Sequence, residues 1–114
     1  MDATGFDLSG TTLNLFCRNI DVDGAKAIAQ SLTTNATLTE LNLGGNNNIG
    51  DDGAKAIAQS LATNNTLTKL DIDNNNIGAD GAKAIAQSLA TNNALTRLDL
   101  CNNNIGADGA SSYS

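Results

Sequence analysis

The sequence contains no histidine, no proline and no tryptophan, and aromatic residues make up only 3% of its 114 positions. Histidine is the usual general base, the commonest metal ligand and the partner of most catalytic nucleophiles, so its absence argues against these kinds of active site. The sequence also has no glycine-rich phosphate-binding loop. We therefore expect a protein that is not an enzyme and binds no cofactor.

Positive charge is also scarce. Six Lys and Arg residues stand against twelve Asp and Glu residues, which gives a net charge of −6. Such a field repels phosphate, so we expect neither nucleic acid nor an anionic membrane as a partner. No apolar run is long enough to cross a bilayer, and Met1 is followed by Asp2 and Asp7 instead of a basic and then apolar leader. These features predict a soluble, untargeted, cytoplasmic protein.

Cysteine is limited to Cys17 and Cys101. In the repeated pattern described below they lie three strands apart, which is roughly 14 Å at about 4.8 Å per strand. A disulfide requires Cα atoms within about 7 Å of each other. We therefore predict two free thiols, which fit a reducing compartment.

What the sequence does contain is one unit repeated almost without change. Its clearest copy, residues 67–93, reads LTKLDIDNNNIGADGAKAIAQSLATNN. Alternating apolar residues at its start predict a short strand, and an asparagine-rich turn follows. Alanine, isoleucine and leucine then recur at helical spacing. The word DGAKAIAQSL predicts helices at its three occurrences, 23–32, 52–61 and 80–89.

The ends of these helices also carry signals. Each predicted helix has an aspartate placed to cap its first turn and to interact with the helix dipole. An asparagine follows the last turn of each helix and is expected to act as a stop, at Asn35, Asn64 and Asn92.

The spacing L-x-x-L-x-L-x-x-N-x-I followed by G-A-x-x-I-A-x-x-L resembles the ribonuclease-inhibitor-like class of leucine-rich repeats. The resemblance covers about residues 13–110 and implies an α/β fold, a curved solenoid of about three to four repeats. Parallel strands would line the concave face and helices the convex face. Within a single domain, 1–114, we predict a cap-like segment at 1–12 (Phe6 and Leu8), repeats at 13–37, 38–66 and 67–94, and a truncated last repeat at 95–114.

The resemblance also implies a buried ladder of asparagine side chains at Asn75 and Asn103. In the first repeat Arg18 stands in this place, and we expect it to reach solvent. The second repeat is one residue longer than the third, so its ladder residue is open. Counting forward from its strand gives Asn46, whereas counting back from its next isoleucine gives Asn47. We expect the pair at 44–45, Gly44 and Gly45, to absorb the extra residue as a bulge.

Residues 71–75 imitate the start of a calcium-binding loop. Such a loop also requires glycine at its sixth position and a bidentate glutamate at its twelfth, where this sequence has Asn76 and Ala82. The repeat pattern already accounts for Asp71 and Asp73 as strand and turn residues. We therefore expect no metal site.

The repeats differ mainly at the outward-facing positions of their strands. Three columns carry these differences: Thr12, Glu40, Lys69 and Arg97; Asn14, Asn42, Asp71 and Asp99; Phe16, Gly44, Asp73 and Cys101. A variable surface on an unvarying scaffold predicts a partner-binding site, with Phe16 as an anchor. Its candidate residues are Phe16, Glu40, Lys69, Asp71, Asp73, Arg97 and Asp99. The alternative is that the charged residues only pair with one another, at about 0–1 kcal/mol for each pair.

These expectations describe a non-catalytic protein–protein interaction module. The repeats are similar to those of NOD-like receptors and of bacterial effectors, and an effector would act in the host cytosol. Two alternatives stay open: a recognition fragment of a larger multidomain receptor or effector, and a regulator of a small GTPase, because Ran GTPase-activating proteins share this repeat class. Since the fourth repeat lacks its helix, we also expect self-association through the uncapped edge at 98–100.

Overall fold

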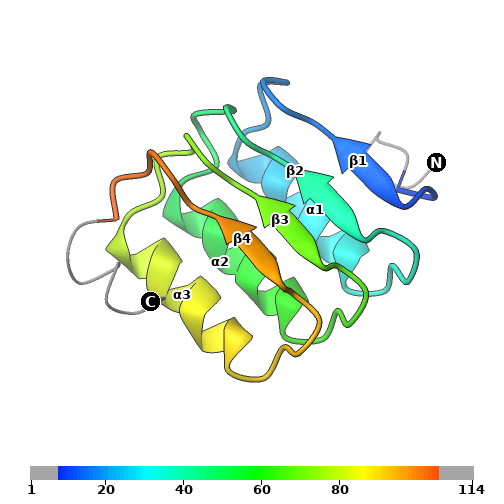
Figure 1. Cartoon of the computed structure of the whole chain (residues 1–114). Coiled ribbons are helices and arrows are strands. Elements are labelled where there is room, and N and C mark those ends of the chain that lie inside the picture. The colour runs from blue at the N-terminus through cyan, green and yellow to red at the C-terminus, as the bar shows by residue number, and fades with distance from the viewer. Residues whose placement is uncertain (1–7, 106–114) are drawn as a thin grey trace.

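The computed structural model describes residues 8–105, in which short strands alternate with helices (Figure 1). The four strands form one parallel sheet in chain order, and the helices pack together on one side of it. The predicted α/β repeat architecture is therefore confirmed. In chain order the elements are β1 (Thr12–Asn14), α1 (Val22–Leu32), β2 (Glu40–Asn42), α2 (Gly50–Leu61), β3 (Lys69–Asp71), α3 (Ala79–Leu89) and β4 (Arg97–Asp99).

The strands pair so that equivalent residues of successive repeats lie side by side. The central leucines, Leu13, Leu41, Leu70 and Leu98, form one such line. Because side chains alternate along a strand, the leucines turn toward the helices and their neighbours turn away. The opposite side of the sheet, here called the strand face, carries two of the three predicted columns. Because each column runs across the sheet from strand to strand, we call them the first and second rows. The first row is Thr12, Glu40, Lys69 and Arg97, and the second row is Asn14, Asn42, Asp71 and Asp99.

The core lies between the sheet and the helices. Ile28, Ile57 and Ile85 occupy the same place in the three helices and are fully buried. The helices approach closely because small residues line their contacts: a methyl group at Gly53 would lie 3.2 Å from Ala25 Cβ. Each buried side chain of this size contributes about 1.5–3 kcal/mol. Replacing the central Ile57 by alanine would cost about 2–5 kcal/mol.

The helices begin one or two residues before the predicted positions, and their caps differ from the prediction. Asp21 caps α1, because its Oδ1 accepts a hydrogen bond of 2.9 Å from the N–H of Gly24. The cap of α3 comes from the preceding repeat: Asp51 Oδ1 accepts from Gly78 N at 2.7 Å and from Gly81 N at 3.0 Å. The aspartates predicted as caps lie within the first turn and still complement the helix dipole.

The three asparagines predicted as helix stops have a larger role. The helices end at Leu32, Leu61 and Leu89, and the asparagines three residues later form a ladder that links the repeats. We call Asn35, Asn64 and Asn92 the helix-exit column. Asn92 shows the pattern, since its Nδ2 donates to Leu61 O and Asn64 O at 2.8 and 2.9 Å. Its Oδ1 accepts from the N–H groups of residues 94 and 95.

A second ladder, the helix-entry column, consists of Asn46, Asn75 and Asn103. Asn75 and Asn103 both form the predicted ladder bonds, but only Asn75 is buried as expected and Asn103 is partly buried. Of the two alternatives in the second repeat, Asn46 is the ladder residue. Asn46 is buried; its Oδ1 accepts from Arg18 N at 2.8 Å and its Nδ2 donates to Leu43 O at 2.7 Å. Arg18 itself is exposed, as expected.

The extra residue of the second repeat lies elsewhere than predicted. It falls after Asn46, and Gly50, with φ +63°, takes part in absorbing it. The expectation that Gly44 and Gly45 absorb it was wrong. In the other repeats the ladder oxygen of the following repeat accepts two N–H groups from this turn, as Asn103 does at 2.8 and 3.0 Å. The lengthened turn offers Asn75 neither group, and the buried Asn75 Oδ1 has no hydrogen-bond partner among residues 8–105.

The ends of the described region differ from its middle. Leu8 is buried, and its carbonyl accepts from Asn35 Nδ2 at 2.8 Å, so this residue behaves as expected of a cap. Phe6, and residues 106–114 of the predicted last repeat, lie outside the described residues. Cys17 and Cys101 are free and exposed. Within residues 8–105, no helix has the length and apolar character needed to cross a membrane.

Candidate protein-binding surface

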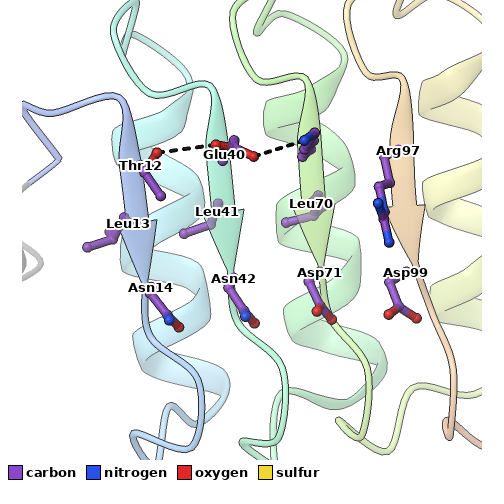
Figure 2. Close-up of a pocket in the computed structure, with 11 residues that line it drawn as sticks. Thr12, Leu13, Asn14, Glu40, Leu41, Asn42, Leu70, Asp71, Arg97 and Asp99 are labelled. Carbon is purple, nitrogen blue, oxygen red and sulfur yellow. Dashed lines mark hydrogen bonds and ion pairs between the residues drawn. The ribbon is translucent and has the colours of Figure 1, made fainter.

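A groove of about 330 Å³ crosses the strand face over all four strands (Figure 2). Both rows line it, together with Leu13, Leu41 and Leu70. Of the seven predicted binding residues it brings together five: Glu40, Lys69, Asp71, Arg97 and Asp99. Phe16 and Asp73 are not among the lining residues and belong to the third column, beyond the strand ends.

In the first row, two of the predicted residues pair with each other. Lys69 Nζ lies 3.2 Å from Glu40 Oε1, and Thr12 Oγ1 donates to Glu40 Oε2 at 3.3 Å. Both charged side chains are about half exposed, so the pair contributes little to stability. Arg97, at the end of the row, makes no ion pair with any residue between 8 and 105. Its side chain extends along β4 toward Asp99 (Figure 2).

In the second row, every side chain makes the same hydrogen bond. One side-chain oxygen accepts from the backbone N–H two residues later and so closes the turn after the strand. The donor–acceptor distances are 3.0 Å for Asn14, 2.8 Å for Asn42, 3.1 Å for Asp71 and 2.9 Å for Asp99. Asparagine and aspartate therefore serve this turn equally well, and only the third and fourth repeats add charge.

The third column contains a notch at Gly44. A methyl group there would collide with Asp73 Oδ1 and would lie 3.1 Å from Oδ1 of both Asn42 and Asp71. The Asp73 carboxylate therefore leans from the third repeat over the glycine of the second. Its Oδ2 accepts from Asn74 Nδ2 at 2.8 Å, but its Oδ1 is buried and has no partner among the described residues.

As a result, three carboxylates converge at one corner of the strand face. Asp71, Asp73 and Asp99 have oxygens that all lie within 4.8 Å of one another. Burial, followed by a hydrogen bond with Asp73, raises the pKa of Asp71 to about 6, and the charges of Asp73 and Asp99 add to this effect. The pKa of Asp99 is lowered, mainly by the N–H of Cys101. We call these three residues the carboxylate corner.

The carboxylate corner is the group of described residues whose spacing could hold a metal ion. It differs from the calcium loop considered for the sequence, because Asp99 comes from the next repeat. The repeat pattern predicted all three residues as outward-facing but did not predict their convergence. The available signal was the pairing of equivalent columns together with the glycine at position 44, which leaves room for Asp73.

Phe16 lies at the margin of the strand face, outside the groove, and is 49% exposed. Its ring packs over the second repeat, where a methyl group at Gly45 would lie 3.0 Å from Cε1 of the ring. Gly45 also has φ +70°, a conformation that favours glycine. Phe16 is therefore an exposed aromatic side chain whose ring packs against Gly45 of the second repeat.

A family model described as Leucine Rich repeat matches residues 34–58, 63–86 and 91–112, more than half of the chain. The chain belongs to the leucine-rich repeat family. The ribonuclease-inhibitor-like subtype depends on the motif spacing alone and stays a prediction. No match was found among curated proteins.

Among solved structures, this leucine-rich repeat chain is similar to that of Leiomodin-1 Actin-Binding Site 2. The TM-score is 0.84 and the sequence identity 28%. The match covers 90% of this chain but only 61% of the other, so the chain spans less than two thirds of that structure.

A second, short family model, described as Ubiquitin interaction motif, matches residues 23–35. This segment is α1 and the turn that follows it. The leucine-rich repeat fold buries the apolar side of α1 at Ala25, Ile28 and Leu32. In the folded chain, a partner of α1 would therefore meet mainly its polar side.

Proposed function

We propose that this leucine-rich repeat protein is a non-catalytic module that binds a protein partner through its strand face. One observation carries the proposal: the three helices share the identical segment DGAKAIAQSL, whereas the charges of the strand face change from repeat to repeat. Packing accounts for the repeated residues, since they form the core. It does not account for the changes, because the same turn hydrogen bonds form with and without charge.

The proposed contact residues are those predicted from the sequence, with unequal weight. Arg97 and the carboxylate corner have no ion pair among residues 8–105 and are free to engage a partner. Phe16 offers an aromatic anchor at the margin. Glu40 and Lys69 already pair with each other, so they are expected to contribute less.

The comparisons suggest two proteins to test. Actin is suggested because the similar structure is an actin-binding site of leiomodin-1, and ubiquitin because the motif model matches α1. A larger receptor or effector of which this chain is the recognition part, and a regulator of a small GTPase, are further proposals. A cytosolic location, in a host cell if the protein is an effector, belongs with them.

The test compares charge reversals on the two sides of the molecule. Arg97→Glu with Asp99→Lys reverses two charges on the strand face, and Lys55→Glu with Lys83→Glu reverses two charges on the helices. Binding of actin, ubiquitin and proteins captured from lysate is measured for each, after circular dichroism has shown unchanged folding. Loss of binding with the first pair alone supports the proposal. Equal loss with both pairs, or with neither, contradicts it.

Self-association is proposed separately, because the last repeat is less covered than the others. Leu89, Leu95 and Leu98 are only partly buried, whereas Leu61 and Leu67 are fully buried. Light scattering over a range of concentrations should show a growing average mass. A constant monomer mass at the highest concentration would contradict this proposal.

A further inference from the structure

The strand face of repeats three and four is negative at one corner, and we propose that this corner receives a lysine or arginine side chain of the protein partner. The inference rests on the proposed function and adds the chemistry of the partner. A basic segment lying in the groove would place its cationic group between Asp71, Asp73 and Asp99. Arg97, on the same strand as Asp99, would face an acidic or polar group of that segment.

The fold itself does not need the charges of the corner. Asn14 and Asn42 close the same turn in repeats one and two with bonds of 3.0 and 2.8 Å. The equivalent bonds of Asp71 and Asp99 are 3.1 and 2.9 Å. Repeats one and two therefore show that an uncharged asparagine is sufficient to close this turn.

In the free protein these charges are also unfavourable. Equivalent residues on neighbouring parallel strands lie about 4.8 Å apart, so Asp71 and Asp99 repel each other. Burial and the nearby carboxylates hold the pKa of Asp71 near 6. When Asp71 is ionised, Asp73 Oδ1 is buried beside further oxygens and has no hydrogen-bond partner among residues 8–105. A group that brings positive charge and several N–H donors would reduce the repulsion between Asp71 and Asp99 and stabilise the ionised form of Asp71.

No cation of the described chain forms an ion pair with the corner, although the charge of Arg97 helps to lower the pKa of Asp99. Lys69, the nearest lysine in the sheet, is held by Glu40 at 3.2 Å. Arg97 is exposed and forms no ion pair within residues 8–105. An ion-pairing cation would therefore come from a partner, and the open groove of about 330 Å³ gives it access to Asp71 and Asp99.

Charge complementarity favours a basic protein segment as the occupant. The net charge of −6 attracts basic surfaces over long distances and raises their association rate. Lysine supplies three N–H donors and arginine five, enough to serve several carboxylate oxygens at once. Because Asp71 must be ionised to accept a cation, affinity should rise as the pH increases through about 6.

The experiment is an NMR titration of ¹⁵N-labelled protein with defined probes at high millimolar concentration. The probes are Nα-acetyl-lysinamide and Nα-acetyl-argininamide, with Nα-acetyl-glutaminamide as the uncharged control and calcium chloride as the metal arm. We expect both cationic probes to shift the amide signals of Asp73 and Cys101, whose N–H groups bond to the corner. The shifts should shrink severalfold between pH 7.5 and pH 5.

Two variants complete the test. Asp71→Asn keeps the turn bond and should abolish the shifts, whereas Asp80→Asn, an exposed helix residue, should leave them unchanged. Shifts with calcium but not with the cationic probes would overturn the inference in favour of a metal site. No shift with any probe, or equal shifts around Asp80, would overturn it as well.

The same variants separate this inference from the proposed function. If a partner is lost on reversal of Arg97 but retained by Asp71→Asn, the strand face binds it without a cation in the corner, and only the inference fails. If the cationic probes bind at the corner but the partner is lost only on reversal of Lys55 and Lys83, the proposed function fails instead.

Discussion

The two asparagine ladders of this protein are built from the same side chain, yet one is continuous and the other is interrupted. In the helix-exit column every amide bonds to the preceding repeat, across sequence separations of 29 residues for Asn64 and 28 for Asn92. In the helix-entry column the bonds on Asn75 Oδ1 are missing. The number of residues in a repeat therefore matters less than where the extra residue lies.

The difference has a local cause. A ladder asparagine forms hydrogen bonds within its own repeat and with the preceding one, so the turns of both repeats must keep their shape. The extra residue sits directly after Asn46, inside the turn that should donate to Asn75. By the time the chain reaches Asn64, helix α2 has restored the regular geometry. The link is lost at one position and nowhere else among the described ladder residues.

The largest expected effect comes from breaking the continuous ladder. Asn64→Leu would leave four backbone partners unpaired: Leu32 O, Asn35 O, Thr66 N and Leu67 N. We expect a loss of about 3–4 kcal/mol in the free energy of unfolding, measured by urea titration. Asn65→Leu is the control, because Asn65 is the exposed neighbour. Similar losses for both variants would show that the ladder is not the cause.

The interrupted ladder should be easier to damage at its weak point. Asn75→Leu removes only the two Nδ2 bonds, to Leu43 O and Asp73 O, and should cost about 1–2 kcal/mol. Asn46→Leu removes bonds at both ends of its amide and should cost more. The comparison would fail if Asn75→Leu proved as costly as Asn46→Leu.

Repairing the ladder should have a smaller effect of opposite sign. Deleting Asn48 gives the second repeat the length of the third and brings donors back toward Asn75 Oδ1. We expect the urea midpoint to rise, by an amount equivalent to about 1 kcal/mol. The same deletion combined with Asp51→Ala tests whether the helix cap was disturbed. A gain that disappears in Asn75→Leu would confirm the repair, and a gain that persists would disprove it.

The smallest effect concerns the strand face. The raised pKa of Asp71 means that the folded protein holds a proton more tightly than the unfolded chain, so stability falls as the pH rises from about 4 to about 6. Asp71→Asn should therefore be more stable than the parent at pH 7, by at most about 1 kcal/mol after allowance for solvent screening. Thermal unfolding at pH 4 and pH 7 measures this. If the stability difference between Asp71→Asn and the parent were the same at pH 4 and at pH 7, the raised pKa of Asp71 would be contradicted.

Much of the fold could be predicted because equivalent positions of the repeats can be aligned with one another. Equivalent leucines must pair in a stack of identical units, so the alignment of Leu41 with Leu70 followed directly from the sequence. The helix-exit column could not be found in this way. An asparagine after a helix signals a stop, and the carbonyls that it bonds belong to the previous repeat. The same limit applied to Asp51, whose partners are in the next repeat.

The sequence predicted which residues of the candidate site lie on the strand face, but it did not predict that the side chain of Asp73 turns toward Asp71 and Asp99. Asp71 and Asp99 were placed side by side by the strand pairing. The approach of Asp73 depends on space left by Gly44 in a different repeat, and on Asn74, which has φ +52°. Local propensity does not contain these facts. The charged corner therefore appears only when neighbouring repeats are packed together.

The helix-exit column has one more consequence, for chemical modification of the chain. Asn35-Ala36-Thr37 and Asn64-Asn65-Thr66 both match the acceptor sequence for N-linked glycosylation. A glycan would be attached to the amide nitrogen that each asparagine uses in the ladder, on Leu8 O and Leu32 O. A glycosylated amide keeps one N–H, whereas Asn64 donates two hydrogen bonds and is buried, so glycosylation at Asn64 is incompatible with the folded ladder. In any compartment that attaches such glycans, the yield of native protein would be set by which of the two reactions is faster.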